Sequence, residues 1–359
     1  MTAVATERWE GWAMTAPGQP VTRQELAPIT PAPGEAVIEV AGCGVCHTDL
    51  SFLYQGVRTR GALPLVLGHE ISGIVHAIGA GVDRSLLLRP VVVPAVLPCG
   101  ECALCLAGRR SICRAQVMPG NDRNGGFASH VVVPARFLCP VPDAVLRSHE
   151  LWELSVVADA VSTPFQAVKR SGLGRDELAI CVGVGVIGVY AVQIAAATGA
   201  RVIALDISDA KLDQARTAGA LATLNLTGLA AKDVRKQVKS LADSLGASPF
   251  LWKIFETSGT RAGQETAWSL IGFGATLAIV GYTVDKIEVS LSNLMAYDAV
   301  AQGIWGADPL VYPELLEWIG DGRIAVKPFV EKHPLASINE VFDDAHNGRL
   351  LKRAVLVPG

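Results

Sequence analysis

The cysteine spacing is the first feature of this sequence that indicates chemistry. Four of the eight cysteines lie within fifteen residues in the order C-x-x-C-x-x-C-x7-C, at Cys99, Cys102, Cys105 and Cys113. Zinc binds four thiolates tetrahedrally, and closely spaced cysteines can surround one ion and leave no open position. An iron–sulfur cluster or unrelated buried thiols are the alternative interpretations. We predict a structural zinc site that holds this loop.

A second pattern, G-x-G-x-x-G, indicates a dinucleotide site. Its predicted contact residues are Gly183, Gly185, Val186, Ile187 and Gly188. The pattern follows an apolar strand and opens a helix rich in small residues, so its glycines would let the backbone turn tightly and approach a pyrophosphate. The alternative is a glycine-rich turn that binds no ligand.

The residues after this turn favour NAD over NADP. Asp206 ends the next predicted strand, where a carboxylate can bind a ribose diol and would repel a 2′-phosphate. Lys211 is a further predicted cofactor contact. Because Lys211 and Arg201 are cationic and lie nearby in the sequence, NADP stays open as the alternative.

Two shorter patterns complete a family resemblance. C-G-V-C-H-T-D occupies residues 43–49 and G-H-E residues 68–70. Each is weak alone, because a lone cysteine or histidine is more often a packed or surface residue. With the four-cysteine loop and the glycine-rich turn, they occur in the order and spacing of the zinc-containing medium-chain alcohol dehydrogenases. The chain resembles that family over essentially its full length.

The resemblance implies two zinc ions per chain, one structural and one catalytic, and NAD as the hydride carrier. It implies Cys46 and His69 as ligands of the catalytic zinc. The family's third ligand, usually a cysteine, falls within residues 157–163, and alignment of the following Ser-Thr places Asp159 there. A carboxylate keeps the charge of a thiolate and supplies an oxygen that zinc accepts. Glu70 is the alternative ligand, with Asp159 then outside the metal's immediate donors.

The resemblance also implies roles for the neighbouring residues. Thr48 matches a residue that hydrogen-bonds the alcohol and starts a proton relay, and Asp49 one that orients a ligating histidine. Ser51 stands where the family often has a histidine, and since a serine is no base, the relay would run through water, ribose hydroxyls or His47. His47 also matches a residue that contacts the pyrophosphate. Arg353 matches an arginine that binds the cofactor phosphates; a solvated surface charge is its alternative reading.

The implied reaction interconverts a secondary, cyclic or allylic alcohol and its ketone. Residues 93–99, 118–121 and 125–130 are similar to a branch of the family that oxidises a ring alcohol carrying a CoA thioester. Its phosphates would need cations, and the predicted ones are Arg58, Arg60, Arg109, Arg110, Arg114 and Arg123. A general dehydrogenase of small or aromatic alcohols, a conjugate enone or enoyl reductase and a non-enzymatic zinc module are the alternatives.

Elements of two kinds must position these residues. The 359 residues are half apolar and carry a formal net charge of -3, which fits two globular domains and favours neither nucleic acid nor a membrane as partner. The predicted strands of the first part are residues 35–40, 73–78, 91–96 and 128–133, with a turn of helix near Cys46. Residues 151–170 are predicted to be helical.

Strands and helices then alternate, which is typical of a doubly wound parallel sheet. Strands are predicted at 178–184, 201–206, 251–256, 276–280 and 287–290, and helices at 187–198 and 209–218. A helix at 313–321 and strands at 326–332 and 354–357 follow. The predicted fold is therefore α/β, with a β-rich domain and a doubly wound parallel sheet. The family resemblance implies that these are a GroES-like catalytic domain with the zinc lobe (residues 1–158 and 295–359) and a Rossmann-type domain (residues 159–294).

Two further expectations concern the setting of the protein. Residues 1–12 carry charge and lack the apolar core of a secretory signal, and adjacent C-x-x-C steps are typical of metal binding in a reducing compartment. We therefore expect a cytoplasmic protein. The family resemblance implies a homodimer, paired near residues 276–290, or a homotetramer.

Overall fold

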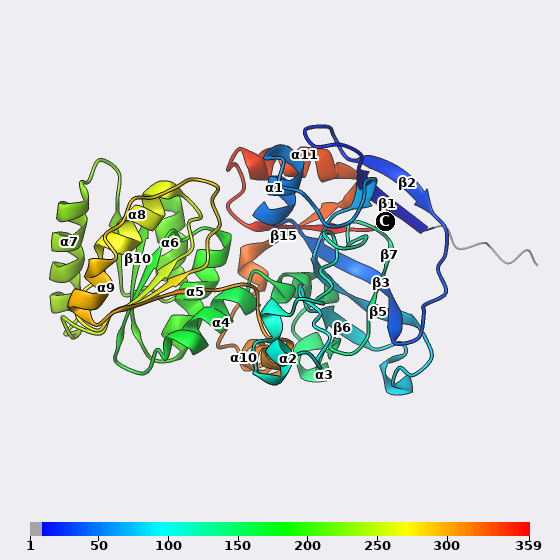
Figure 1. Ribbon diagram of the computed structural model, residues 1–359, viewed down its shortest axis with the longest axis horizontal. Helices are drawn as coiled ribbons and strands as arrows, with labels where there is room; N and C mark the ends of the chain where they lie inside the picture. The colour runs from blue at the N-terminus through cyan, green and yellow to red at the C-terminus, as the bar shows by residue number, and fades with distance from the viewer. Residues whose placement is uncertain (1–8) are drawn as a thin grey trace, which may run out of the picture. The chain divides into compact units, whose positions relative to one another are not determined.

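Antiparallel strands dominate the first of two structural units. The structure is a computed structural model that describes residues 9–359. The described chain divides into unit 1 (residues 9–160, 306–320 and 326–359) and unit 2 (residues 161–305 and 321–325). Unit 1 has a seven-stranded sheet in the order β15-β16-β3-β5-β6-β8, with β7 paired to β3. A smaller sheet has the order β2-β1-β4 (Figure 1).

The strands of unit 1 are β1 (Trp9–Met14), β2 (Thr22–Leu26), β3 (Glu35–Gly44), β4 (Leu65–Val66), β5 (Glu70–Ile78), β6 (Pro90–Val93), β7 (His130–Pro134), β8 (Cys139–Pro140), β15 (Val330–Pro334) and β16 (Arg353–Val357). Its α-helices are α1 (His47–Tyr54), α2 (Ala103–Leu106), α3 (Asp143–Leu146), α10 (Tyr312–Gly320) and α11 (Ile338–His346). Its 3-10 helices are η1 (Arg84–Leu86), η2 (Arg110–Ile112), η3 (Leu151–Ala158), η4 (Pro309–Val311), η5 (Lys327–Phe329) and η6 (Leu335–Ser337).

The pairing of β3 with β5 is the part of unit 1 that matters most for the site. These strands are apolar and largely buried, and their register breaks between Val37 and Ile38 and again between Val40 and Gly42. Such irregularities bend a strand and change where its last side chains point. At the end of the ladder Gly44 is paired with Glu70. The residues just after β3 and just before β5 are therefore neighbours in space.

Unit 2 is a parallel sheet with helices packed on it. Its six strands have the order β11-β10-β9-β12-β13-β14, and every pairing is parallel. The strands are β9 (Leu178–Val182), β10 (Arg201–Asp206), β11 (Ala222–Asn225), β12 (Lys253–Glu256), β13 (Thr276–Ile279) and β14 (Val300–Gly303). The helices are α4 (Ser162–Ser171), α5 (Val186–Ala197), α6 (Asp209–Thr217), α7 (Ala231–Ser244), α8 (Arg261–Ser269) and α9 (Ser292–Tyr297).

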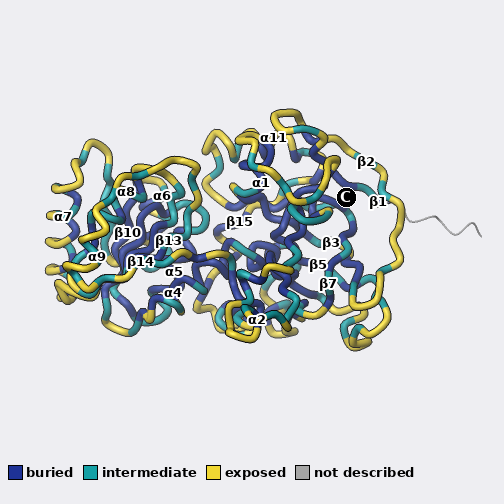
Figure 2. The backbone as a smooth tube through the Cα atoms, in the orientation of Figure 1, coloured by how far each residue is buried: buried dark blue, intermediate teal, exposed yellow. Residues whose placement is uncertain are grey.

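The apolar periodicity of unit 2 explains its layers. In α7 the buried residues Val234, Val238 and Ala242 recur at four-residue steps, and they pack with α8 on one face of the sheet. The outer side of α7 is exposed, whereas the central strands are buried (Figure 2). In the sheet, β10 and β11 follow β9 on one side, while β12, β13 and β14 follow on its other side. This reversal of strand order between β9 and β12 is the arrangement expected for a doubly wound sheet. The fold class predicted from the sequence is confirmed.

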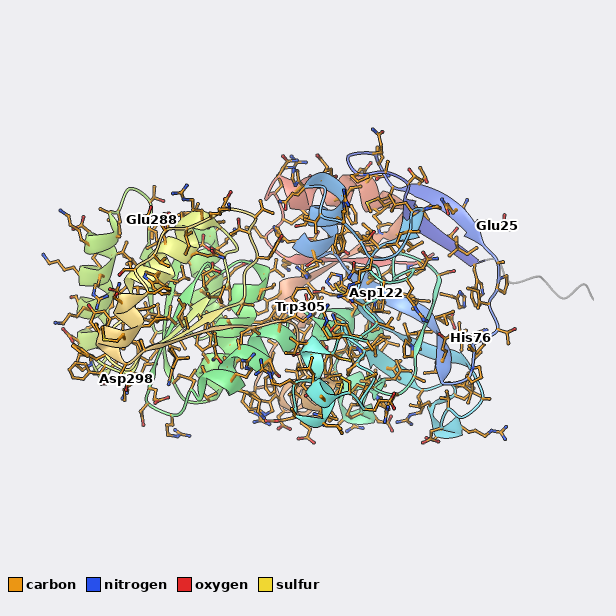
Figure 3. The ribbon with its side chains drawn as sticks, in the orientation of Figure 1. Glu25, His76, Asp122, Glu288, Asp298 and Trp305 are labelled. Carbon is orange, nitrogen blue, oxygen red and sulfur yellow. The ribbon has the colours of Figure 1, made fainter. Side chains whose placement is uncertain are left out.

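Two local expectations for unit 2 differ from the structure. Residues 287–290 form no strand; that segment is irregular, and Glu288 on it is exposed (Figure 3). The sixth strand is β14 instead, paired with β13 and lying beyond residue 294, where the sequence analysis ended this domain. β14 is short and partly exposed, so it lacks the apolar run by which a buried strand is recognised.

The helix predicted over residues 151–170 is interrupted. The 3-10 helix η3 ends at Ala158 and α4 begins at Ser162. Asp159 lies in the interruption with φ -142° and ψ -57°, which is neither helical nor extended. The sequence analysis did not detect this break, because the apolar periodicity is continuous across it. At the break the Asp159 side chain leaves the direction that a continuous helix would give it.

Two further observations concern the whole described chain. All eight cysteines lie within residues 9–359, and none of them is in a disulfide. Among the helices of that range, none has the length and hydrophobicity that a membrane span requires.

Candidate active site and zinc centres

The end of the β3–β5 ladder brings Cys46 and His69 together. Cys46 precedes α1, and His69 precedes β5, so the pairing of Gly44 with Glu70 places both residues at one edge of the sheet. Both are buried, with exposures of 3% and 1%. Gly44 is required here, because a Cβ at that position would lie 2.0 Å from Oε2 of Glu70.

Asp159 joins this pair from the interruption between η3 and α4. Its Oδ2 lies 3.6 Å from Cys46 Sγ and 3.6 Å from His69 Nε2. A tetrahedral zinc with ordinary bond lengths would separate a sulfur and an oxygen ligand by about 3.6 Å, and a nitrogen and an oxygen by about 3.4 Å. Together with Glu70, these donor atoms lie within 4.8 Å of one another. The distances fit one shared metal ion.

Glu70 belongs to the same cluster but is bound by other partners. Its Oε2 accepts a hydrogen bond of 2.9 Å from Nε of Arg353, and its Oε1 accepts from Nη2 of Arg353. The backbone N–H of Ala160 donates to Oε1 at 3.0 Å. Burial raises the pKa of the Glu70 carboxyl, and the guanidinium of Arg353 opposes that shift. Arg353 is thus buried and contacts Glu70. Its role at the cofactor phosphates, which the family resemblance implies, stays a prediction.

Asp49 lies on the Nδ1 side of the His69 ring and orients it. The two oxygens of Asp49 accept from the backbone N–H of Cys46 at 3.0 Å and of Gly68 at 3.1 Å, and Oδ1 lies 3.3 Å from Nδ1 of His69. Within the described chain neither ring nitrogen of His69 makes a hydrogen bond of ordinary geometry. Burial lowers the pKa of His69, but the charges of Asp49 and Cys46 outweigh this and raise it well above its usual range. A buried imidazole whose Nε2 faces a thiol and a carboxylate suits a metal ligand.

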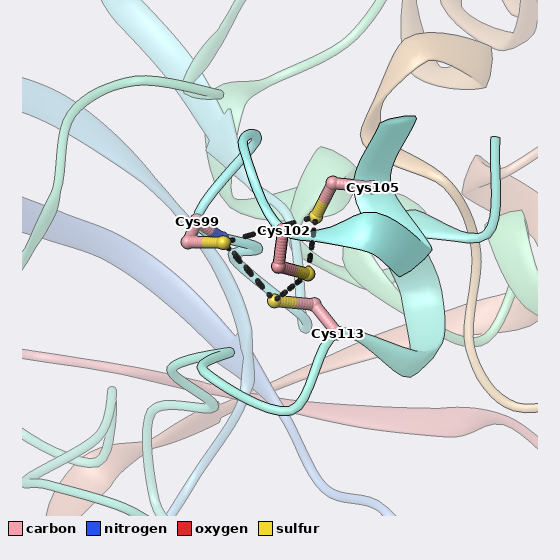
Figure 4. Close-up of side chains that lie close together, drawn as sticks. All are labelled: Cys99, Cys102, Cys105 and Cys113. Carbon is pink, nitrogen blue, oxygen red and sulfur yellow. Dashed lines mark hydrogen bonds between the residues drawn. The ribbon is translucent and has the colours of Figure 1, made fainter. Parts of the chain in front are cut away.

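The four cysteines of the loop form a second donor set. Figure 4 shows their sulfur atoms pointing toward one another. The sulfur–sulfur distances are 3.5 Å for Cys99 and Cys113, 3.6 Å for Cys102 and Cys105, 3.7 Å for Cys102 and Cys113, and 3.9 Å for Cys99 and Cys105. Zinc–sulfur bonds of 2.3 Å give a tetrahedron with edges of about 3.8 Å. This donor set fits a closed zinc site.

The environments of these thiols differ. Backbone N–H groups of Glu101 and Cys102 lower the pKa of Cys99 to about 6, whereas burial raises the pKa of Cys105 to about 12. A dication favours the thiolate form of every cysteine it contacts, which offsets the cost at Cys105. Cys43 lies near the other site, but burial raises the pKa of its thiol well above the usual range, and it is absent from both donor sets.

The glycine-rich turn of unit 2 has the shape that the sequence predicts. β9 ends at Val182, and α5 begins at Val186 with Gly185 at its N-cap. Gly183 has φ +82°, and a Cβ there would lie 2.4 Å from Cβ of Ser258. A Cβ on Gly188 would lie 2.0 Å from the carbonyl oxygen of Gly183. These two positions therefore require glycine, and the turn leaves the amides at the start of α5 available to an anion.

Charged residues also lie around this turn. Asp206 ends β10, and its Oδ2 accepts from the backbone N–H of Val184 at 2.8 Å. The amine of Lys211 lies 4.0 Å from the position of a Cβ on Gly185, so this cation reaches the start of α5. Arg201 forms an ion pair of 3.2 Å with Asp176. Of the two cations that kept NADP open, Arg201 is therefore engaged elsewhere.

The residues predicted for the proton relay lie on α1. Thr48 Oγ1 is 3.7 Å from Cys46 Sγ, which places the hydroxyl beside the metal donors. Ser51 is buried, and its hydroxyl donates to the carbonyl oxygen of His47 at 2.9 Å. The Ser51 hydroxyl is therefore bound to the backbone of its own helix. The His47 side chain is exposed.

Comparisons with known proteins agree with this geometry. Residues 32–143 match the model of the alcohol dehydrogenase GroES-like domain, and residues 186–321 match that of the zinc-binding dehydrogenases. An alcohol dehydrogenase of Geobacillus stearothermophilus is 31% identical over 329 residues, which cover 90% of this chain and 91% of that protein. The chain belongs to the zinc-dependent, NAD-linked alcohol dehydrogenase family.

Solved structures extend the family comparison to the fold. The alcohol dehydrogenase of Aeropyrum pernix is 27% identical with a TM-score of 0.86, covering 97% of this chain and 100% of its own. Acetophenone reductase from Geotrichum candidum, solved in complex with NAD, is 26% identical with a TM-score of 0.84, covering 98% and 97%. The alcohol dehydrogenase family thus accounts for the two units and for the presence of two donor sets.

One contact between predicted site residues, and one further residue, were not found from the sequence. The ion pair of Glu70 with Arg353 joins residues 283 positions apart, and no local pattern signals it. Glu256 ends β12, and its Oε1 binds the backbone N–H groups of Ser258 and Gly259, which shapes the turn packed against Gly183. An acidic residue at the carboxyl end of a buried strand, followed by Thr-Ser-Gly, could have indicated this turn.

Proposed function

We propose that this alcohol dehydrogenase oxidises a secondary alcohol to a ketone at a zinc ion held by Cys46, His69 and Asp159. The observation that carries the proposal is the position of Asp159 Oδ2, at 3.6 Å from both the Cys46 sulfur and the His69 Nε2 atom. Three donors of this kind leave one position of a tetrahedral zinc for substrate.

The contacts of Glu70 support Asp159 as the third ligand. For Glu70 to bind the metal directly, its carboxylate would have to leave Arg353 and the Ala160 N–H. Removing one partner from a buried ion pair costs about 3–5 kcal/mol. For Asp159, by contrast, Oδ2 already lies 3.6 Å from both Cys46 Sγ and His69 Nε2.

The residues around the donors have roles in orienting His69 and in proton transfer. A zinc ion held by these donors would supply Lewis acidity toward the alcohol oxygen, and bound NAD would supply the hydride acceptor. Asp49 holds the orientation of His69, and the Thr48 hydroxyl, beside the Cys46 sulfur, can accept the alcohol proton. Because Ser51 is bound to a backbone carbonyl, we assign proton release to the exposed His47.

The cofactor preference follows from the turn in unit 2. Asp206 lies at the end of β10, where its negative charge would repel a 2′-phosphate. Arg201, which could have bound that phosphate, is paired with Asp176. Lys211 lies over the start of α5, where it can contact the cofactor. These charges support NAD over NADP.

For the substrate, we propose a cyclic allylic alcohol, with 6-hydroxycyclohex-1-ene-1-carbonyl-CoA as its most specific form. Three of the six arginines predicted to bind the CoA phosphates are engaged in ion pairs within the protein. Arg60, Arg110 and Arg123 pair with Asp122 at 3.3 Å, Asp308 at 3.1 Å and Glu35 at 2.7 Å. Only Arg58, Arg109 and Arg114 of the predicted cations are then left for this role.

A substrate comparison tests the reaction. The purified protein is incubated with NAD or NADP and with 2-cyclohexenol, a small primary alcohol or the CoA thioester, while reduced nicotinamide is followed by absorbance. We expect oxidation of 2-cyclohexenol with NAD preferred, and a higher kcat/KM for the thioester if CoA is recognised. Failure to oxidise any secondary alcohol, with reduction of the C=C bond of 2-cyclohexenone by added NADH or NADPH instead, would replace the proposal with a conjugate reductase.

The ligand assignment has its own test. In Asp159→Ala we expect one zinc per chain instead of two and a kcat/KM lower by about 10³-fold, because an open donor set holds the catalytic metal poorly. Asp159→Cys is the matched control, since it restores the thiolate of the commonest family pattern and should keep both zinc ions. Two tightly held zinc ions in Asp159→Ala would contradict the assignment.

We also propose that copies of this chain associate through the β14 edge of the unit 2 sheet, as a homodimer or within a homotetramer in the cytoplasm. Leu291, Met295 and Val300 near that edge are 71%, 79% and 56% exposed. An unpaired strand edge beside apolar side chains is a surface that proteins usually cover. Light scattering that gives the mass of a single chain would exclude this association.

A further inference from the structure

Asp159 lies in the link between two helices of unit 1 and unit 2. η3 ends at Ala158 and α4 begins at Ser162, and the backbone angles of Asp159 belong to neither helix nor strand. Contacts from other segments of unit 1 reach this link.

Two such contacts hold the peptides on either side of Asp159. The carbonyl oxygen of Ala158 accepts a buried hydrogen bond from the hydroxyl of Tyr312, and it also accepts from the backbone N–H of Ala95 at 3.3 Å. On the other side, the N–H of Ala160 donates to Glu70 at 3.0 Å. The Glu70 contact belongs to the donor cluster itself, whereas Tyr312 comes from a helix and lies 154 positions after Ala158.

We propose that Tyr312 is a positioning residue for the catalytic metal site: its hydroxyl fixes the Ala158 carbonyl and thereby aims the Asp159 carboxylate at Cys46 and His69. The inference rests on the proposed function, in which Asp159 is a zinc ligand. Tyr312 is 1% exposed and does not belong to the donor cluster, so its effect passes through the backbone of residues 158 and 159.

Tyr312 is itself firmly held. It is the first residue of α10 and follows η4, whose N-cap residue Asp308 accepts from the N–H of Leu310 at 3.1 Å. The other oxygen of Asp308 accepts from Nη1 of Arg110 at 3.1 Å. Arg110 lies in the cysteine loop, between Cys105 and Cys113. The segment that carries Tyr312 therefore connects the four-cysteine lobe to the ligand Asp159.

The test is Tyr312→Phe in the full-length protein, which removes the hydroxyl and keeps the ring. Outer contacts that orient a ligand typically change metal affinity by about 10- to 100-fold when lost. We expect the catalytic zinc of Tyr312→Phe to bind about 10-fold more weakly in competition with a chelator, with the lobe zinc unchanged. The d–d absorption bands of the cobalt-substituted catalytic site should shift, which a merely structural role for Tyr312 would not cause.

Two further variants separate the possible results. Tyr190→Phe removes a buried tyrosine hydroxyl from unit 2 and should leave metal affinity and cobalt spectrum unchanged. Asp159→Ala should lose the catalytic metal. If Asp159→Ala loses it but Tyr312→Phe behaves like the unmodified protein, the role of Tyr312 is overturned and the ligand assignment stands. If Asp159→Ala keeps both metals tightly, the ligand assignment fails.

A folding defect in Tyr312→Phe would be detected by circular dichroism. The same measurements are then made on Asp308→Asn, which loosens the segment before Tyr312 without touching the ring. A weaker catalytic metal and a shifted cobalt spectrum in Asp308→Asn support the inference. An unchanged affinity and spectrum overturn it.

Discussion

The two donor clusters of unit 1 are assembled in opposite ways. The lobe takes four thiols from one loop of fifteen residues, Cys99 to Cys113. The mixed cluster takes Cys46 and His69 from adjoining ends of two strands, and Asp159 from a position 113 residues after Cys46. The first site depends mainly on its own loop, while the second depends on the sheet register, the interruption after η3 and the residues that hold it.

The two clusters also differ in whether their donors leave a coordination position open. Four thiolates close the coordination of a zinc ion, so the lobe has no position for substrate. A thiolate, an imidazole and a carboxylate leave a position open, and Glu70 and Arg353 place two further charges beside it. A site assembled from distant segments can thus hold an incomplete donor set, because the fold rather than the metal supplies its geometry.

The largest effect should follow from removing a donor of the mixed cluster. In Cys46→Ala we expect kcat/KM to fall by more than about 10³-fold, because the Lewis acid that the reaction needs is lost. Thermal stability should change little, since the lobe and both cores stay intact. Metal analysis should give one zinc per chain. Retention of full activity would show that the mixed cluster is not the catalytic centre.

Removing a lobe donor should reverse this pattern. In Cys102→Ala we expect the midpoint of thermal unfolding to fall by about 5–10 °C, because a structural metal contributes directly to folding free energy. Activity per correctly loaded catalytic zinc should fall far less than in Cys46→Ala. Differential scanning calorimetry with metal analysis on both variants measures the contrast. An unchanged midpoint would mean that the lobe does not stabilise the fold.

The same contrast explains what the sequence could predict. The lobe cysteines, the turn from Gly183 to Gly188 and the strand ending at Asp206 are local patterns, and the structure brings each together as expected. The alternation of strands and helices was sufficient to predict the parallel sheet of unit 2. Patterns of this kind can be predicted because all the residues that form them lie close together in the sequence.

Non-local features could not be read in this way. Whether Asp159 or Glu70 faces the Cys46 and His69 donors depends on Arg353, which lies 283 positions from Glu70. The interruption at Asp159 was hidden in a continuous apolar periodicity, and β14 was too short and exposed to be distinguished from a loop. Family resemblance could name the ligand position, but the partners that fix it come only from the tertiary structure.

The smallest expected effect tests whether the two clusters communicate. Arg110 joins the lobe to Asp308, and both side chains are partly exposed, at 25% and 13%, so the pair contributes at most about 1 kcal/mol. In Arg110→Gln we therefore expect the catalytic zinc to bind about 2- to 5-fold more weakly in chelator competition. Arg123→Gln is the matched control, because Arg123 forms a similar pair with Glu35 that has no link to Tyr312. Equal responses of the two variants would show that the lobe and the catalytic cluster are energetically independent; a response confined to Arg110→Gln would mean that the local site helps to shape the non-local one.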